Sequence, residues 1–218
     1  NNFTNLNLVN VTSAANMFIN SGNISGFETL NMPKLQNTYY MFRNSRAEII
    51  GDINYPLVTI SQYMFSNCQN LKIIGNLYLP NSSTMPYMIH ECPNLETLGA
   101  IHADKSNQYS NLIICRSNST LPYEKLQNFG GFINLGKGYT YKGLNHYMYT
   151  VNLLQLPNLT QRSVQNVITN LYNLCITYNV SSASALSYKQ NIMIYDTQYN
   201  LLTTDEGNLK LKNISRKL

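Results

Sequence analysis

Histidine and cysteine are the residues of this sequence best suited to catalysis or metal binding, so their spacing decides whether either chemistry is expected. The three histidines, His90, His102 and His146, have no carboxylate or cysteine nearby at the spacing of a metal site. His90 precedes Glu91 directly, and successive side chains of an extended chain point to opposite faces. The four cysteines form no Cys-x-x-Cys pair, which argues against zinc. The sequence therefore predicts no catalytic residue, no cofactor and no metal ion.

A glycine-rich stretch at residues 130–143 invites comparison with a phosphate-binding loop. Residues 131–137 have the Gly-x-x-x-x-Gly-Lys spacing of such a loop. The next residue is Gly138, where the loop requires the Ser or Thr hydroxyl that binds magnesium. We therefore expect a structural role for this stretch and no bound nucleotide.

The elements that position these side chains follow a sequence repeat of about 24 residues. Each repeat has an apolar pair, then a small residue three places later, and then a glycine. The pairs are Met17-Phe18, Met41-Phe42, Met64-Phe65, Met88-Ile89 and Leu112-Ile113; the small residues are Ser21, Ser45, Cys68 and Cys92; the glycines are Gly51, Gly75 and Gly99. A repeat of this length with leucine and isoleucine at constant offsets is typical of a leucine-rich repeat solenoid, in which coils stack as parallel strands.

The repeated phrase resembles a known family. Met64-Phe65-x-x-Cys68-x-x-Leu71-x-x-Ile74, followed by Leu77-x-Leu79-Pro80, is similar to the BspA-type leucine-rich repeats of bacterial and some protist surface proteins and of proteins from bacteriophages of gut bacteria, including crAss-like phages. Residues 129–137, 154–160 and 163–172 are similar to the closing segment of the phage and gut-bacterial versions. The resemblance implies a solenoid used as a binding scaffold, with many different partners across the family.

We therefore predict a leucine-rich repeat solenoid over residues 1–152, built as a parallel β ladder with irregular returns, and a C-terminal α/β cap over residues 153–218. Residues 1–16 are expected to form a degenerate first coil, and residues 116–152 are expected to be irregular. In the cap we predict a strand at residues 154–157, a helix with Thr160 as N-cap and an apolar stripe over the open end of the solenoid, a strand at residues 191–195 and a short helix capped by Thr204. The stripe consists of Val164, Val167, Ile168 and Leu171.

Three features of the coils have specific expectations. The Met-Phe pair of each central coil should be buried. Cys68 and Cys92 occupy the small-residue column, where they could approach disulfide distance, but buried free thiols act as small apolar groups and fit the alternation of Ser and Cys there. We therefore predict free thiols. The column glycines provide either a positive φ or close approach of neighbouring backbones.

Charge and composition limit the classes of partner. Charged residues make up 11% of the chain, whereas Asn occupies 33 positions and Tyr 17. The net charge is +5, but residues 28–116 contain six acidic and six basic residues, so the solenoid is neutral and nucleic acid is not an expected partner. No apolar run approaches the roughly 18 residues of a membrane helix. A polar skin of Asn, Ser, Thr and Tyr resembles the contact chemistry of binding loops.

Together, these features predict a noncatalytic binding module. The leading hypothesis is a component of a bacteriophage virion, in a tail fibre or baseplate, that contacts a host-cell surface protein or glycan, or other virion proteins, as part of a larger assembly. The alternative is a bacterial cell-surface adhesin, which would be extracellular. An enzyme that uses the solenoid as a scaffold is the least favoured class.

The expected partner site is a column on the outer side of the sheet. In the phrase before each Pro, the first and third residues are apolar and should face the core, so the middle residue should face solvent. These middle residues are Asn7, Asn31, Asn54, Tyr78, His102 and Gln155. Tyr78 and His102 contribute the largest contact area, and Tyr is common at binding hot spots. The alternatives are a merely solvated column, or a site in the loops around Tyr39, Tyr63 and Tyr87.

Overall fold

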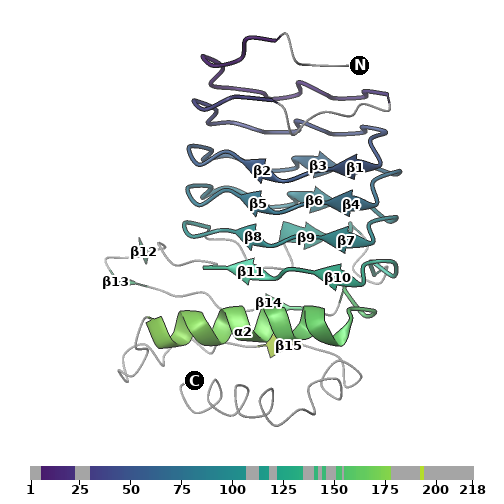
Figure 1. Ribbon diagram of the computed structural model, residues 1–218, viewed down its shortest axis with the longest axis vertical. Helices are drawn as coiled ribbons and strands as arrows, with labels where there is room; N and C mark the ends of the chain where they lie inside the picture. The colour runs from purple at the N-terminus through teal and green to yellow at the C-terminus, as the bar shows by residue number, and fades with distance from the viewer. Residues whose placement is uncertain are drawn as a thin grey trace.

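The computed structural model describes residues 6–22, 30–106, 113–117, 122–134, 140–141, 144–145, 151–153, 155–177 and 192–193. The described chain winds in coils that stack along the long axis of the molecule, and helix α2 (Gln161–Thr177) lies beneath the last of them (Figure 1). The predicted solenoid of parallel strands is thus observed.

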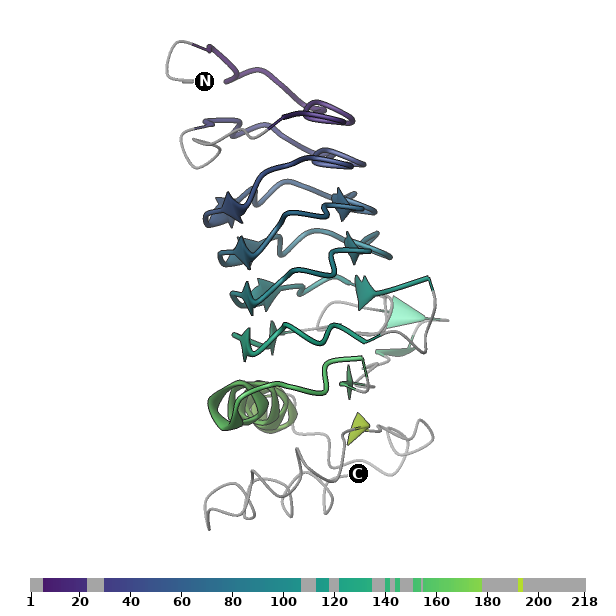
Figure 2. The same cartoon turned by 90° about the vertical axis from the view of Figure 1, so that its right-hand side faces the viewer.

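Each central coil contributes three strands of two residues, and equivalent strands of successive coils pair in parallel. One ladder contains β1 (Ile49–Ile50), β4 (Ile73–Ile74), β7 (Thr97–Leu98) and β10 (Asn128–Phe129); the second contains β2 (Ile53–Asn54), β5 (Leu77–Tyr78), β8 (Ile101–His102) and β11 (Phe132–Ile133); the third contains β3 (Phe65–Ser66), β6 (Ile89–His90) and β9 (Ile114–Cys115). The first two ladders lie on one side of the solenoid, which we name the front face. The third ladder lies on the opposite side (Figure 2), and we name it, with the turns before its strands, the back face.

The repeat lengthens once and then resumes. Ile74 pairs with Leu98, its equivalent one repeat later. Leu98 pairs with Phe129, which lies further along the chain than one more repeat of about 24 residues would reach. The same ladder continues in the second sheet, where Phe132 pairs with Ile101. Residues 128–129 and 132–133 therefore continue both front-face ladders in register, which corrects the interpretation of this part of residues 116–152 as irregular chain. A longer return between Cys92 and Tyr123 accommodates the extra residues.

The core is built from the repeated apolar pairs. The rings of Phe18, Phe42 and Phe65 stack along the axis with centroid distances of 5.4 and 5.3 Å, and Met41 and Met64 are fully buried. The expected burial of the pairs in the central coils is therefore confirmed, whereas Met17, in the first described coil, is 37% exposed. Stacked aromatic rings of this kind add to the stabilisation from burial alone.

The column glycines allow neighbouring backbones to approach closely. A Cβ atom on Gly99 would lie 2.5 Å from the backbone nitrogen of Asn76 and the carbonyl carbon of Gly75, and a Cβ on Gly75 or Gly130 would also meet the backbone of the preceding coil. None of these three has a positive φ; that conformation occurs at Gly131, at 90°. Of the two expected roles, close approach is the correct one.

Cys68 and Cys92 are buried free thiols, as predicted. The Sγ of Cys68 donates to the carbonyl oxygen of Phe42, and the Sγ of Cys92 donates to that of Phe65, each at 3.0 Å. Each thiol therefore binds the backbone of the preceding coil, whereas the hydroxyl of Ser45, in the same column, accepts from Ser21 Oγ at 3.1 Å and from Ala47 N at 3.2 Å.

Helix α2 covers the last front-face strands, as expected. The Oγ1 of Thr160 accepts a hydrogen bond from the backbone nitrogen of Ser163 at 3.3 Å, which confirms the N-cap. Val164, Val167 and Ile168 are buried, and the helix packs against β10 and β11. The side chain of Leu171 lies outside the described part of the chain.

The polar side of α2 satisfies the free edge of β10. Ser163 Oγ donates to Gln127 O and accepts from Phe129 N, both at 2.9 Å. The side-chain amides of Asn166 and Asn170 donate to Phe129 O and Gly130 O, each at 3.2 Å. An unpaired strand edge is a site for unwanted pairing with other chains, so this helix ends the ladder as well as covering its core.

Two further pairs of short strands follow the solenoid. β12 (Thr140–Tyr141) pairs with β13 (Leu144–Asn145) in antiparallel fashion, and β14 (Val151–Asn152) pairs with β15 (Ile192–Met193) in parallel. The strand expected at residues 191–195 is thus present at its centre. The helix expected after Thr204 lies outside the described residues.

The strand expected at residues 154–157 is wrong. Asn158 Nδ2 donates to Glu124 O at 2.8 Å, which repeats the bond from Asn94 Nδ2 to Gln69 O at 2.6 Å. Residues 156–159 are therefore the counterpart of residues 92–95, the turn that precedes a front-face strand. Both segments contain the sequence Pro-Asn-Leu, which indicates the turn. The Leu-x-Leu-Pro pattern of residues 154–157, which indicated a strand, is misleading here.

Candidate functional site

The predicted column exists on the front face, over β2, β5, β8 and β11. Asn54, Tyr78 and His102 pair in register, each between two buried neighbours along its own strand. Tyr78 is 42% exposed, and its ring centroid lies 5.0 Å from that of His102 at an interplanar angle of 60°. Asn31 and Asn7 are also exposed, and Asn31 lies between buried Leu30 and Met32. The period-2 alternation therefore accounts for four of the six expected residues, Asn31, Asn54, Tyr78 and His102, whereas Asn7 is exposed next to Leu6, which is itself 56% exposed.

Gln155 does not belong to this column. The residue paired with His102 in the next coil is Ile133. Gln155 lies instead beside Arg116, whose backbone nitrogen donates to Gln155 Oε1 at 3.1 Å. This correction has the same cause as the misplaced strand, because Gln155 precedes a turn and not a Pro-terminated strand.

A second exposed row on the front face was not foreseen from the sequence. Ile49 is 58% exposed and Ile73 37% exposed, and they pair in register with each other and then with Thr97 and Asn128. The signal was ambiguous because both residues of the Ile49–Ile50 and Ile73–Ile74 pairs are apolar, so alternation alone does not say which member faces solvent. The two rows give the front face apolar, aromatic and amide groups side by side.

Side-chain hydrogen bonds join the coils between these two rows. The backbone nitrogen of Asn76 donates to Asp52 Oδ1 at 2.7 Å, and that of Ala100 donates to Asn76 Oδ1 at 2.9 Å. Each side chain thus satisfies a backbone group of the next coil. These bonds hold the two rows in a fixed relation to each other.

The back face has a ladder of tyrosines. The rings of Tyr40, Tyr63 and Tyr87 stack with centroid distances of 5.0 and 4.9 Å. All three residues have positive φ, at 54°, 54° and 58°, a conformation that bulky side chains rarely adopt. The sequence singled out Tyr39, Tyr63 and Tyr87 as an alternative site. The structure corrects the first of these, because Tyr40 continues the stack while Tyr39 packs against Tyr40 at 4.1 Å.

A second back-face column, four residues further along each coil, also has positive φ. It contains Asn20, Asn44, Asn67 and Glu91. The amide of Asn44 donates to Asn20 Oδ1 at 2.8 Å and the amide of Asn67 donates to Asn44 Oδ1 at 2.7 Å. Asn tolerates the left-handed conformation better than most residues, so the sequence preference and the backbone agree in this column.

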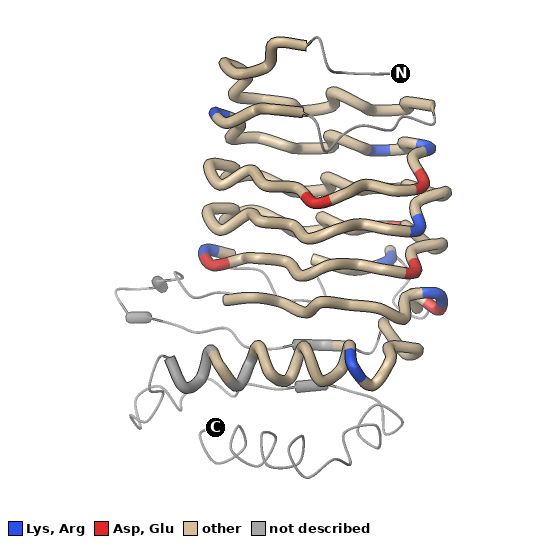
Figure 3. Tube along the Cα trace, in the orientation of Figure 1, with Lys and Arg blue, Asp and Glu red and all other residues tan. Residues whose placement is uncertain are grey.

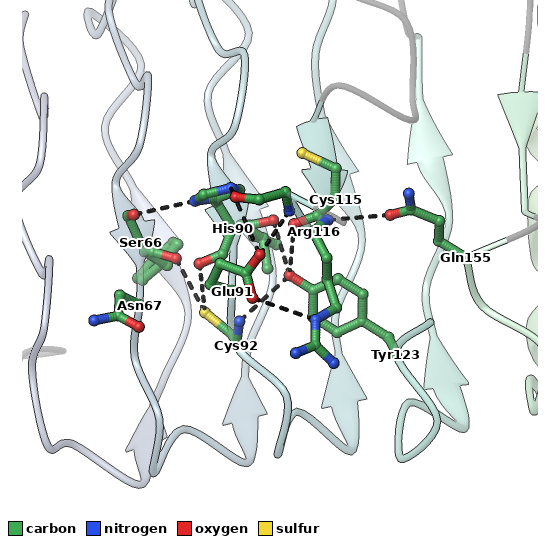
Figure 4. Close-up of polar contacts among 12 residues, drawn as sticks. Ser66, Asn67, His90, Glu91, Cys92, Cys115, Arg116, Tyr123 and Gln155 are labelled. Atoms are coloured by element: carbon green, nitrogen blue, oxygen red, sulfur yellow. Dashed lines mark hydrogen bonds and ion pairs between the residues drawn. The ribbon is translucent and has the colours of Figure 1, made fainter. Parts of the chain in front are cut away.

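At the end of the back face, His90 and Glu91 lie in a polar cluster with Arg116 (Figure 4), and Ser117 contacts both of them. Glu91 Oε2 lies 3.3 Å from Arg116 Nε, and Glu91 Oε1 accepts from the backbone nitrogen of Ser117 at 2.6 Å. His90 Nε2 lies 3.0 Å from Ser117 Oγ and 4.0 Å from Glu91 Oε1. The expectation that His90 and Glu91 point to opposite faces is wrong, because the positive φ of Glu91, at 53°, turns the chain.

The protonation states of this cluster favour a structural role. Burial lowers the pKa of His90 more than Glu91 raises it, so the imidazole is neutral near pH 7. Burial raises the pKa of Glu91, but the Ser117 hydrogen bonds and the Arg116 charge outweigh that effect and lower it. The Nδ1 atom of His90 faces Ser66 Oγ at 3.4 Å and not a carboxylate. A Ser-His-acid relay needs an acid at that nitrogen, and this cluster instead ties residues 115–117 to the preceding coil.

Tyr123 is a core residue that the sequence did not reveal. Its hydroxyl lies 3.1 Å from the carbonyl oxygens of both Ile89 and Cys115, to which it donates, and accepts from Cys92 N at 3.4 Å. The side chain is fully buried, and burial raises its pKa well above the usual value. Tyr123 occupies the column of Cys68 and Cys92 in the coil after the longer return. The available signal was its spacing to Leu126, which equals that of Cys92 to Leu95.

Charge differs between the two faces. The front-face segments, residues 48–55, 72–79, 96–103 and 127–134, contain three acidic residues and one lysine. The back-face segments, residues 36–47, 60–71, 84–95 and 113–117, contain three arginines and one glutamate. Figure 3 shows that many charged residues lie at the lateral edges of the coils. The neutral solenoid is thus divided into a slightly acidic and a slightly basic side.

Within the described residues, no group of three or more His, Cys, Asp and Glu side chains is placed to hold a metal ion. No helix in that part of the chain has the length and apolar character needed to cross a membrane. Comparison with known protein families, with curated proteins and with solved structures finds no match to this chain. The class of protein therefore follows from the fold itself, a parallel β solenoid with a helical cap.

Proposed function

We propose that this chain is a noncatalytic binding module of the BspA-like leucine-rich repeat type, carried by a bacteriophage virion in a tail fibre or baseplate. The constant coil register, in which Ile49 pairs with Ile73, and the buried Met-Phe pairs support a leucine-rich solenoid. The resemblance of the repeated phrase and of the closing segment to phage-encoded proteins supports the virion assignment. The bacterial surface proteins that share the phrase support the alternative, an extracellular adhesin.

The observation that carries the proposal is the front-face column around Tyr78. A tyrosine ring that is 42% exposed lies on a rigid parallel ladder and packs against His102. Tyrosine provides a large contact area with few rotatable bonds, so a partner gains contacts at a low entropic cost. Asn31 and Asn54 extend the column with side chains that both donate and accept hydrogen bonds. A host-cell surface protein, a glycan or another virion protein would be recognised along this column.

The test is attachment of the purified, fluorescently labelled chain to host cells. The double variant Tyr78→Ala, His102→Ala removes the two largest contact groups and should weaken cell binding about tenfold or more, the effect of losing a hot spot. Its melting curve should stay close to that of the unmodified protein because both side chains lie outside the core. Asn128→Ala, an exposed change in the other front-face row, is the matched control. Unchanged attachment of the folded double variant would remove the site from this column.

The virion and adhesin hypotheses predict different locations for the protein, which an antibody can distinguish. An antibody against the chain should label purified phage particles if the virion assignment is correct. Labelling of the bacterial surface in a culture free of phage, with none on particles, would overturn it in favour of the adhesin.

A further inference from the structure

The tyrosine ladder of the back face is not a requirement of the backbone. The position equivalent to Tyr40 in the preceding coil is held by Asn16, which has the same left-handed conformation, with φ of 60°. Asn is the better residue for this conformation, since a bulky side chain is disfavoured at positive φ. Three successive coils nevertheless carry Tyr there. Backbone outliers of this kind concentrate at functional sites, so the ladder points to a role beyond folding.

The ladder offers unsatisfied hydrogen-bonding groups at a constant repeat. Tyr40, Tyr63 and Tyr87 are half-buried, and their ring centroids are spaced by 5.0 and 4.9 Å along the axis. Within the described part of the chain, the hydroxyls of Tyr63 and Tyr87 have no hydrogen-bond partner. The rings stack on each other, so neighbouring rings cover each other's faces, and the His90 ring packs at near right angles against Tyr63 and Tyr87, with centroid distances of 5.6 and 5.5 Å. The surface therefore presents the hydroxyls of Tyr63 and Tyr87, each able to donate and to accept, beside Tyr40, whose side chain is hydrogen-bonded to Tyr39.

Positive charge lies at one end of this row. The guanidinium carbon of Arg43 lies 4.6 Å above the centroid of the Tyr40 ring, which fixes the orientation of the side chain. No carboxylate in the described residues pairs with Arg43. The acidic residue of the back-face segments, Glu91, is already engaged by Arg116 at 3.3 Å. An oriented guanidinium without an acidic partner is suited to bidentate binding of a carboxylate.

We propose that the tyrosine ladder, with Arg43 at its end, binds a linear acidic polysaccharide that lies parallel to the solenoid axis. A polymer of similar sugar units presents hydroxyl groups at a regular repeat, which matches tyrosine rings spaced by 5.0 and 4.9 Å better than the irregular surface of a folded protein does. The phenol hydroxyls bind the sugar hydroxyls, the ring edges contact the carbon-bound hydrogens of the sugar, and Arg43 binds a uronate carboxylate. The charge of the back face complements that of the polymer. This site lies opposite the front-face column and stands independently of it.

The experiment is affinity electrophoresis of the purified chain in native gels that contain polygalacturonate, hyaluronate or alginate, with methylcellulose as the neutral polymer. The unmodified chain should be retarded by at least one acidic polymer and much less by methylcellulose. The double variant Tyr63→Asn, Tyr87→Asn should weaken that binding about tenfold or more. Asn keeps the left-handed backbone, as Asn16 shows, so the variant is expected to fold. Arg43→Gln should weaken binding several-fold, whereas Arg43→Lys should restore part of it.

Controls separate the ladder from other causes. Tyr78→Ala on the front face should leave retardation unchanged, and Tyr63→Phe should show how much of the effect comes from one hydroxyl. Circular dichroism and thermal melts establish that each variant is folded. Absence of retardation by all three acidic polymers overturns the proposal, as does equal retardation of the folded Tyr63→Asn, Tyr87→Asn variant. Equal retardation by methylcellulose overturns the acidic class of ligand and the role of Arg43.

Discussion

The front and back faces of the solenoid use the same repeat in opposite ways. On the front face, each coil changes the exposed residue, so that one column reads Asn54, Tyr78, His102 and Ile133. On the back face, the same half-buried residue is repeated in three successive coils, as in the ladder of Tyr40, Tyr63 and Tyr87. A varied column is complementary to one particular surface, whereas a repeated column is complementary to a repeating ligand. A solenoid can therefore present two kinds of binding chemistry on one core.

The backbones of the two faces differ as well. Front-face residues pair in extended strands, where any side chain is tolerated and the exposed position is free to vary. The back-face columns lie at positive φ, where few residue types are favourable. The Asn column follows that restriction and the tyrosine ladder does not. The ladder is therefore the more unusual feature.

The largest effect is expected in the glycine column, where the front-face coils approach closely. Gly99→Val would place side-chain atoms against the backbone of Gly75 and Asn76, because a Cβ already meets them at 2.5 Å. We expect a loss of about 3 kcal/mol in the free energy of unfolding. Chemical denaturation measures it. Gly22→Val is the control, since a Cβ there meets no atom within 4 Å; equal stability of the two variants would contradict the close stacking of the coils.

A smaller loss is expected at the end of the back-face ladder of strands. Tyr123→Phe removes the hydroxyl that binds Ile89 O, Cys115 O and Cys92 N, and leaves buried backbone groups without that partner. The expected cost is about 1 to 3 kcal/mol in the free energy of unfolding. Tyr63→Phe, whose hydroxyl has no described partner, should change stability little. If both variants melt alike, Tyr123 does not act as the polar link between the coils.

The smallest expected effect is a pH dependence from His90. Its pKa is lowered in the folded protein by burial, so the unfolded chain binds the proton more tightly. The free energy of unfolding should therefore be constant above about pH 6.5 and should decrease as the pH falls below it. His90→Gln should remove that decrease and leave the carboxylate titration at lower pH. A stability that rises as the pH is lowered through this range would show that the charged imidazole is favoured in the fold.

The features that the sequence predicted well are those in which the same residue type recurs at the same position of several repeats. The constant repeat spacing placed Phe42 and Phe65 in one core column, and alternation placed Asn54 and Tyr78 in solvent. The helix after Thr160 was also predictable, because its cap and its apolar stripe are local signals. In each case a single sequence pattern indicates both the secondary structure and which side chains are buried.

The features that the sequence did not predict depend on backbone conformation or on a change of register. No glycine marks the positive φ of Tyr63 or Glu91, so neither the tyrosine ladder nor the contact between His90 and Glu91 could be foreseen. The longer return before Tyr123 shifted the later coils, and Gln155 was consequently assigned to the wrong column. Strand pairing reveals such a shift directly, whereas in the sequence only the Tyr123–Leu126 spacing and the repeated Pro-Asn-Leu sequence indicate it.

The most direct test of the two-face account is a crossed comparison of the two double variants in both binding assays. Tyr78→Ala, His102→Ala should lose attachment to cells and keep retardation by the acidic polysaccharide. Tyr63→Asn, Tyr87→Asn should lose retardation and keep the contribution of the front face to attachment. If either folded variant loses both activities equally, or if neither loses any, the assignment of separate binding chemistries to the two faces is contradicted.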